Sequence, residues 1–146
     1  SFMAGDTATN NAPSGVQGVC PVGWHIPSDK EWEILELTLG ANVSSFALST
    51  RPIEDQELGY KLSSTSADDW TNVSNNYDIY KFSAQGSGAA QNNIFYYLKT
   101  RGMYATTTTK STGFITRRFM NGKINIETSP QSGTNALFVS IRCVKD

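Results

Sequence analysis

Few residues of this chain could do acid–base or nucleophilic chemistry. His25 is the only histidine, and the two cysteines, Cys20 and Cys143, lie near opposite ends of the 146 residues. A catalytic histidine must face a cleft with a nucleophile within hydrogen-bonding distance. His25 instead lies between Trp24 and the pair Ile26–Pro27, a setting typical of a chain corner. We therefore expect its ring to bond nearby backbone, and we expect no catalytic site.

The two cysteines leave two alternatives open. Their separation suits a single disulfide that joins the first and last elements in an oxidising compartment. The other alternative is a pair of buried thiols in a reducing compartment. A zinc site is disfavoured, because two cysteines and one histidine supply at most three of the usual four ligands and are not closely spaced.

Oxygen-rich and aromatic residues offer other candidate sites. Asp68 and Asp69 could bind calcium, the one possible cofactor, or could simply form a solvated acidic loop. Flat aromatic rings with amide and guanidinium groups are what a sugar or peptide site needs, although strand alternation sends about half of such rings inward. The candidate ligand-binding residues of this kind are Trp70, Asn72, Asn92, Tyr96, Tyr97, Tyr104 and Arg118.

Composition narrows the class of protein and of partner. The net charge of -1 disfavours nucleic acid and anionic membrane surfaces as partners. No stretch approaches the roughly 18 apolar residues that span a bilayer, so we expect no membrane span. With 17% charged and 38% hydrophobic residues, the chain has the composition of a globular domain with a polar, loop-rich exterior. Its length predicts one domain over residues 1–146.

Local patterns predict the elements that position these residues. Ser28 and Glu31 form an S-x-x-E capping box, and Gly40 stands where a helix commonly ends, so we expect a helix over 29–39. Two alternating runs flank Asn121–Gly122, the preferred pair for a two-residue hairpin turn, which would place Phe119 opposite Ile124.

Further alternating runs predict strands. Aromatic and β-branched residues at 94–98 and 103–109 favour two strands. The run 136–144 also alternates, and we interpret it as a core strand that brings Cys143 next to Cys20. The predicted chain therefore has an early helix, a late hairpin and a last strand close to the first turn.

Several segments together resemble the Fibrobacter succinogenes major paralogous domain. The segment SGVQGVCPVGWHIPSDKEWEIL resembles the hallmark of that family, and VSIRCVKD resembles its closing strand. Three stretches between them, GYKLSSTSADDW, KFSA and IFYYLKTRGMYATTT, resemble further family motifs. The sequence departs from the family at Gln85–Gly88, which replace an L-P-G-G-Y-R stretch, and at Ala105, which replaces an aromatic residue.

The resemblance implies an α+β, C-type-lectin-like fold related to the formylglycine-generating enzyme. One or two helices would pack on short twisted antiparallel sheets, with adjacent termini. Cys20 and Cys143 stand at the positions of the family's terminal disulfide, so copper-thiolate chemistry at a free cysteine is not expected. The family occurs in exported and lipid-anchored proteins of Fibrobacter and Bacteroidetes-type bacteria, which implies an extracellular or outer-surface location.

Two functions follow as expectations. The first is a non-catalytic cell-surface recognition module that binds glycan or protein in adhesion or assembly. The alternative is a structural module of a surface protein or filament, completed by a strand-donating neighbouring chain and without a small-molecule ligand. We also expect that Ser1 follows an upstream strand region of a longer polypeptide.

Overall fold

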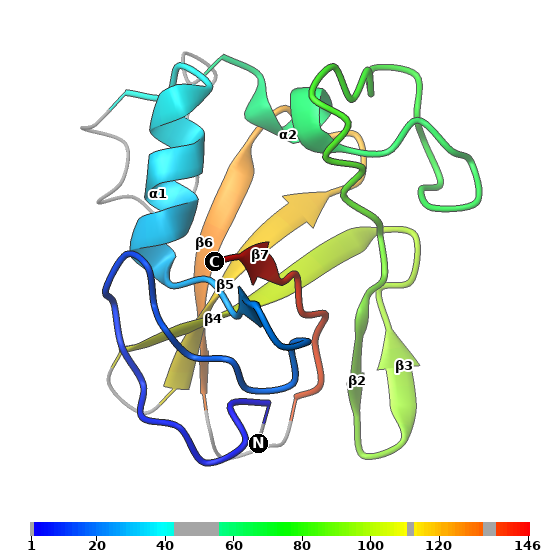
Figure 1. Cartoon of the computed structure of the whole chain (residues 1–146). Coiled ribbons are helices and arrows are strands. Elements are labelled where there is room, and N and C mark those ends of the chain that lie inside the picture. The colour runs from blue at the N-terminus through cyan, green and yellow to red at the C-terminus, as the bar shows by residue number, and fades with distance from the viewer. Residues whose placement is uncertain (1, 43–55, 111–112, 133–136) are drawn as a thin grey trace.

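The chain forms a mixed α+β fold in this computed structural model, which describes residues 2–42, 56–110, 113–132 and 137–146 (Figure 1). Within those residues two helices accompany three small antiparallel sheets, ordered β1-β7, β2-β3 and β4-β5-β6. The elements are β1 (Trp24–His25), α1 (Asp29–Thr38), α2 (Leu58–Leu62), β2 (Ala89–Gln91), β3 (Ile94–Tyr96), β4 (Arg101–Lys110), β5 (Gly113–Met120), β6 (Ile126–Ser132) and β7 (Val144–Lys145).

The three-stranded sheet has two differently used faces. Tyr104, Phe119 and Ile126 alternate onto one face, where they join Trp32 of α1 in the main hydrophobic core. The rings of Tyr104 and Phe119 meet edge to face, with centroids 5.7 Å apart. Arg118 and its cross-strand neighbours lie on the opposite face. A cavity on that side, described below, is lined by no residue of α1 or α2.

Helix α1 begins as predicted. The Ser28 hydroxyl accepts the backbone N–H of Glu31 at 3.2 Å, and the Glu31 carboxylate accepts the backbone N–H of Ser28 at 2.9 Å, which completes the capping box. The predicted helix over 29–39 ends one residue earlier, at Thr38, with Leu39 as its C-cap. This cap fixes the first turn of α1, which lies over the sheet in Figure 1.

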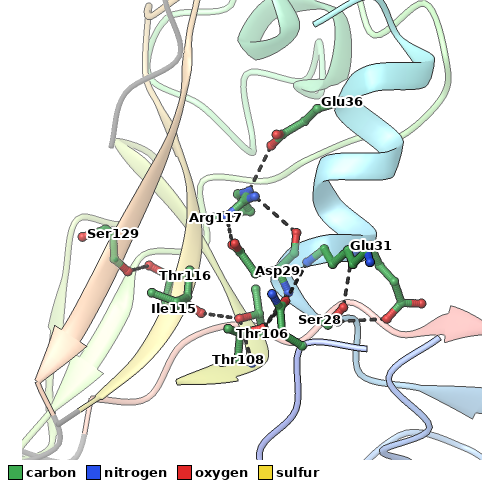
Figure 2. Close-up of polar contacts among 12 residues, drawn as sticks. Ser28, Asp29, Glu31, Glu36, Thr106, Thr108, Ile115, Thr116, Arg117 and Ser129 are labelled. Atoms are coloured by element: carbon green, nitrogen blue, oxygen red, sulfur yellow. Dashed lines mark hydrogen bonds and ion pairs between the residues drawn. The ribbon is translucent and has the colours of Figure 1, made fainter. Parts of the chain in front are cut away.

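A buried ion cluster ties α1 to β5. Arg117 is fully buried, and its Nε donates to the Glu36 carboxylate at 3.0 Å, itself 0% exposed. Its Nη1 also donates to the carboxylate of Asp29, in the first turn of α1 (Figure 2). Because a buried charge is tolerated only when it is paired and hydrogen-bonded, these contacts fix how α1 sits on the sheet.

The β5–β6 hairpin forms, but its predicted register is wrong by two residues. Phe119 pairs with Ile126 instead of Ile124. The connection is longer than two residues because the Ile124 carbonyl accepts the backbone N–H of Gly59 at 2.8 Å, which holds that segment against α2. A shift of two residues preserves strand alternation, so Phe119 still faces the core.

The end of the chain lies beside its first strand. Trp24 pairs with Lys145 and His25 with Val144, and Cys20 and Cys143 form the expected disulfide. The predicted core strand over 136–144 is wrong in extent, since Val144, the first residue of β7, is the one position of 137–144 that lies in a strand, and Ala136 lies outside the described residues. Single bridges from Phe138 and Ser140 replace the rest, because the segment passes successively along β2 and β4.

No helix in the described ranges is long and apolar enough to cross a membrane.

Candidate functional site

The part of the chain that the structure describes forms two concave regions large enough to bind a ligand. The larger, of about 840 Å³, is a groove between α1 and the paired strands β1 and β7. Trp24, Ile34 and Val144 line it and are 39 to 48% exposed, and Phe82 lies beneath the guanidinium of Arg142, 3.9 Å from the ring centroid. The groove is therefore mostly apolar, and its polar lining includes Arg142, Lys145 and a cluster around His25.

His25 lies in the wall of this groove, clamped between two carboxylates. Its Nδ1 is 2.7 Å from Asp146 Oδ1, and its Nε2 is 2.7 Å from Glu31 Oε1. The prediction that the ring bonds nearby backbone is wrong, because α1 and the last residue bring these side chains to it. Burial lowers the pKa of His25, but the hydrogen bonds and negative charges of Glu31 and Asp146 raise it by more. The pKa therefore lies above its ordinary value of 6.5.

This cluster makes stability depend on pH. The unfolded ring titrates near 6.5 and the folded ring above it, so the folded state holds the proton more tightly. The stabilisation is complete below pH 6.5 and is lost as the pH rises through the folded pKa. We expect the free energy of unfolding, measured with denaturant at a series of pH values, to fall across this window.

The control is His25→Gln, which removes the titrating ring but keeps a polar side chain. Its stability should change little over the same pH range. A wild-type curve that is flat, or that runs parallel to the His25→Gln curve, would contradict the clamped, protonated ring.

The second cavity, of about 400 Å³, lies between the outer face of the main sheet and the β2–β3 hairpin. It differs from the groove in its chemistry, because guanidinium, amide and phenol groups converge on it. Such convergent polar groups beside apolar surface are typical of a ligand site. The lining residues are Ala89, Gln91, Tyr96, Tyr97, Arg101, Met103, Arg118, Gln131 and Leu137.

The β2–β3 hairpin supplies the tyrosines. Asn92 and Asn93 link its strands with φ angles of 51° and 62°, the left-handed pair that a tight type I′ turn requires. Gly88 lets the two arms of the hairpin approach closely, since a Cβ atom there would lie 2.3 Å from the carbonyl oxygen of Tyr96. Its backbone N–H donates to the carbonyl of Arg101 in β4 at 2.7 Å. In Figure 1 the hairpin extends down the side of the molecule away from α1.

Tyr97 holds an unusual backbone conformation. Its φ of 62° is left-handed, which costs a non-glycine residue about 1 to 2 kcal/mol. Its carbonyl accepts the backbone N–H groups of Thr100 and Arg101, at 3.0 and 2.9 Å. The same turn places the Arg101 guanidinium 3.8 Å from the centroid of the Tyr97 ring. The strained backbone of Tyr97 therefore lies in the same turn that holds the Arg101 guanidinium over the Tyr97 ring.

Three of the predicted ligand-binding residues meet in this cavity, namely Tyr96, Tyr97 and Arg118. The rings of Tyr96 and Tyr97 lie 6.1 Å apart between centroids and are 38 and 48% exposed. Arg118 projects from β5, where its Nε donates to the Glu127 carboxylate at 2.6 Å. Together they present two accessible rings beside an anchored guanidinium.

The other four predicted residues lie elsewhere. Trp70 is 1% exposed, and its Nε1 donates to the Ala84 carbonyl at 2.9 Å. Tyr104 is 6% exposed, and burial raises the pKa of its hydroxyl. Both rings fill the core, so they offer no face to a ligand. Asn72 lies beside the β5–β6 turn, where its backbone N–H donates to Asn121, and Asn92 belongs to the hairpin turn.

Asp68 and Asp69 do not converge with other carboxylates among the described residues. Asp69 accepts the hydroxyl of Ser64 at 2.5 Å and the amide of Gln85 at 3.0 Å, so it fastens neighbouring loops. Asp68 is exposed. Within the described ranges no group of three histidine, cysteine or acidic residues could hold a metal ion.

Sequence reasoning missed Gln91, Arg101 and Gln131, which complete the polar lining. Gln131 is held by bonds from its amide to Ser129 at 3.0 Å and to Thr116 at 3.4 Å. The signal for Arg101 lies in the β4–β5 register, which pairs Met103 with Arg118 and so brings Arg101 to the same face two residues away.

A comparison with protein families gives one assignment. The family model described as the Fibrobacter succinogenes major domain matches residues 7–145, nearly the whole chain. Comparisons with curated proteins and with solved structures gave no match. The disulfide between Cys20 and Cys143, which the family resemblance implied, is present in the structure. The chain therefore belongs to the Fibrobacter succinogenes major domain family.

Proposed function

We propose that this domain is a non-catalytic recognition module of an exported protein, which binds a glycan in the cavity beside the β2–β3 hairpin and serves adhesion or assembly. The observation that carries the proposal is the meeting of two accessible tyrosine rings with guanidinium and amide groups around about 400 Å³. Aromatic faces pack against the apolar faces of sugar rings, while the polar groups bond hydroxyls.

Other observations support the remaining parts of the proposal. Disulfides persist in oxidising surroundings, in keeping with an extracellular or outer-surface location and with the C-type-lectin-like fold implied by the family resemblance. A non-catalytic role is favoured because carboxylates already engage both ring nitrogens of His25, and both cysteines are bonded to each other. The His25 ring and the two cysteines therefore already have structural roles in the folded domain.

A glycan array tests this proposal. Wild-type protein should bind a subset of sugars, and Tyr97→Ala should weaken that binding by about tenfold, as expected for a central aromatic contact. Tyr80→Ala is the matched control, since Tyr80 is also 48% exposed but lies outside the cavity. The absence of any bound sugar, or equal losses in the two variants, would contradict the proposal.

The exposed edge of β3 favours a second candidate, assembly through a strand from a neighbouring chain. Among the described strands β3 pairs only with β2, and Phe95 and Leu98 are 80 and 65% exposed. Residues 89–98 contain no charge, although charged side chains ordinarily protect sheet edges. Association with a neighbouring chain that Phe95→Lys abolishes would support this candidate. A measured mass of 16.0 kDa, that of one chain, at every protein concentration, alone and mixed with neighbouring chains, would contradict it.

A further inference from the structure

The cavity beside the β2–β3 hairpin carries positive charge in a protein whose net charge is -1. Arg101 and Arg118 line it, and none of the described residues that line it is acidic. Glu127 pairs with Arg118 across β5 and β6, and its carboxylate neutralises one of the two charges. About one positive charge is therefore left over for a ligand, in a wall that also contains two tyrosine rings.

The two guanidinium groups are placed to act on one ligand. Met103 pairs with Arg118 across β4 and β5, and Arg101 lies two residues before Met103 on the same face. Side chains in this diagonal relation start about 7 to 8 Å apart, within reach of one small group for two long side chains. Both side chains therefore start on the same face of the sheet and line the same cavity.

Each guanidinium is also held before any ligand arrives. Arg118 donates its Nε and Nη2 to Glu127, and its side chain keeps 24% exposure. Arg101 stacks on the Tyr97 ring at 3.8 Å and has no ion-pair partner among the residues that the structure describes. Preorganised donors lose little side-chain entropy on binding, so their hydrogen bonds contribute more to affinity.

We infer that the ligand of this cavity is an acidic glycan, whose sugar carboxylate binds Arg101 and Arg118. This inference rests on the proposed glycan-binding function and names the substrate class. A planar carboxylate matches the fork of N–H donors on a guanidinium. The rings of Tyr96 and Tyr97 then cover the apolar face of the same sugar, and the amides of Gln91 and Gln131 bond its hydroxyls.

Matched pairs of sugars test the inference by calorimetry on the intact chain. The probes are trigalacturonic acid with its neutral counterpart galactotriose, and sialyllactose with its neutral methyl ester. At least one acidic member should bind about tenfold or more tightly than its neutral partner, the effect of a charge-assisted hydrogen bond. Raising the salt concentration should weaken the acidic sugar selectively, because salt screens exposed charges.

Arg101→Gln should reduce the acidic preference to about twofold or less, since the unpaired charge is lost. Arg101→Lys keeps the charge but loses the planar fork, so part of the preference should remain. Lys99→Gln is the control, because Lys99 lies two residues away, outside the cavity, and donates to the Ala67 carbonyl. Circular dichroism confirms that each variant is folded.

The outcomes separate this inference from the proposed function. Equal binding of acidic and neutral sugars overturns the inference and leaves glycan recognition standing. An acidic preference that survives Arg101→Gln overturns the placement of the carboxylate, whatever the result for Lys99→Gln. Absence of binding by all four sugars, together with an empty glycan array, overturns both.

Discussion

Arg117→Met should lower the free energy of unfolding by about 3 to 5 kcal/mol, the cost of breaking a buried ion pair by removing one partner. The guanidinium of Arg117 lies 3.0 Å from the carboxylate of Glu36, and both side chains are 0% exposed. Methionine fills much of the space but leaves that carboxylate buried without its guanidinium. Chemical denaturation followed by the fluorescence of the buried tryptophans measures the loss.

Arg118→Met is the matched control, on the next residue and the opposite face of β5. Its ion pair with Glu127 is partly exposed, at 24 and 18%, so its loss should cost about 1 kcal/mol or less. The double variant Arg117→Met/Glu36→Leu should recover part of the stability, because both members of the buried ion pair are then replaced by apolar side chains and the unpaired Glu36 charge is removed. Equal losses in Arg117→Met and Arg118→Met would contradict the role of the buried cluster shown in Figure 2.

Removal of the disulfide should destabilise the domain by a similar or larger amount. The bond links residues 123 positions apart, and closing a loop of that length restricts the unfolded chain by about 4 to 5 kcal/mol in the chain-entropy model. Locally, the short β1–β7 pairing and the contact between His25 and Asp146 reinforce the same junction. The double variant Cys20→Ser/Cys143→Ser should therefore unfold at markedly lower denaturant concentration.

Reduction of the wild-type protein is the companion measurement. It should add about 2 Da to the intact mass, one hydrogen for each thiol, and lower the unfolding midpoint as the double variant does. Reductant should leave the double variant unchanged. An unfolding midpoint that neither reduction nor the Cys20→Ser/Cys143→Ser substitution lowers would contradict the stabilising role of the disulfide.

Much of the framework follows from short-range sequence signals. The capping box at Ser28 and Glu31 fixes the start of α1, because both of its bonds lie within one turn. The alternation that sends Phe119 into the core survives the error in register, since a shift of two residues preserves the face. The disulfide agrees with the family resemblance and with the position of both cysteines beside β1 and β7.

The site was harder to predict because it depends on contacts between distant segments. Trp70 and Tyr104 have the same chemistry as Tyr96 and Tyr97, and only the packing decides which rings are buried. Arg101 becomes a candidate only once the pairing of β4 with β5 is known. The carboxylates at His25 likewise come from α1 and from the end of the chain, which no local pattern places together.

Nuclear magnetic resonance mapping tests the central claim, recognition at the cavity beside the β2–β3 hairpin, most directly. The isotope-labelled protein is titrated with the best-binding sugar of the array. The account predicts that amide shifts move at 89–91, 96–103, Arg118 and Gln131, around the cavity. Shifts confined to the groove at Trp24, Ile34 and Val144, or no shifts at all, would contradict it.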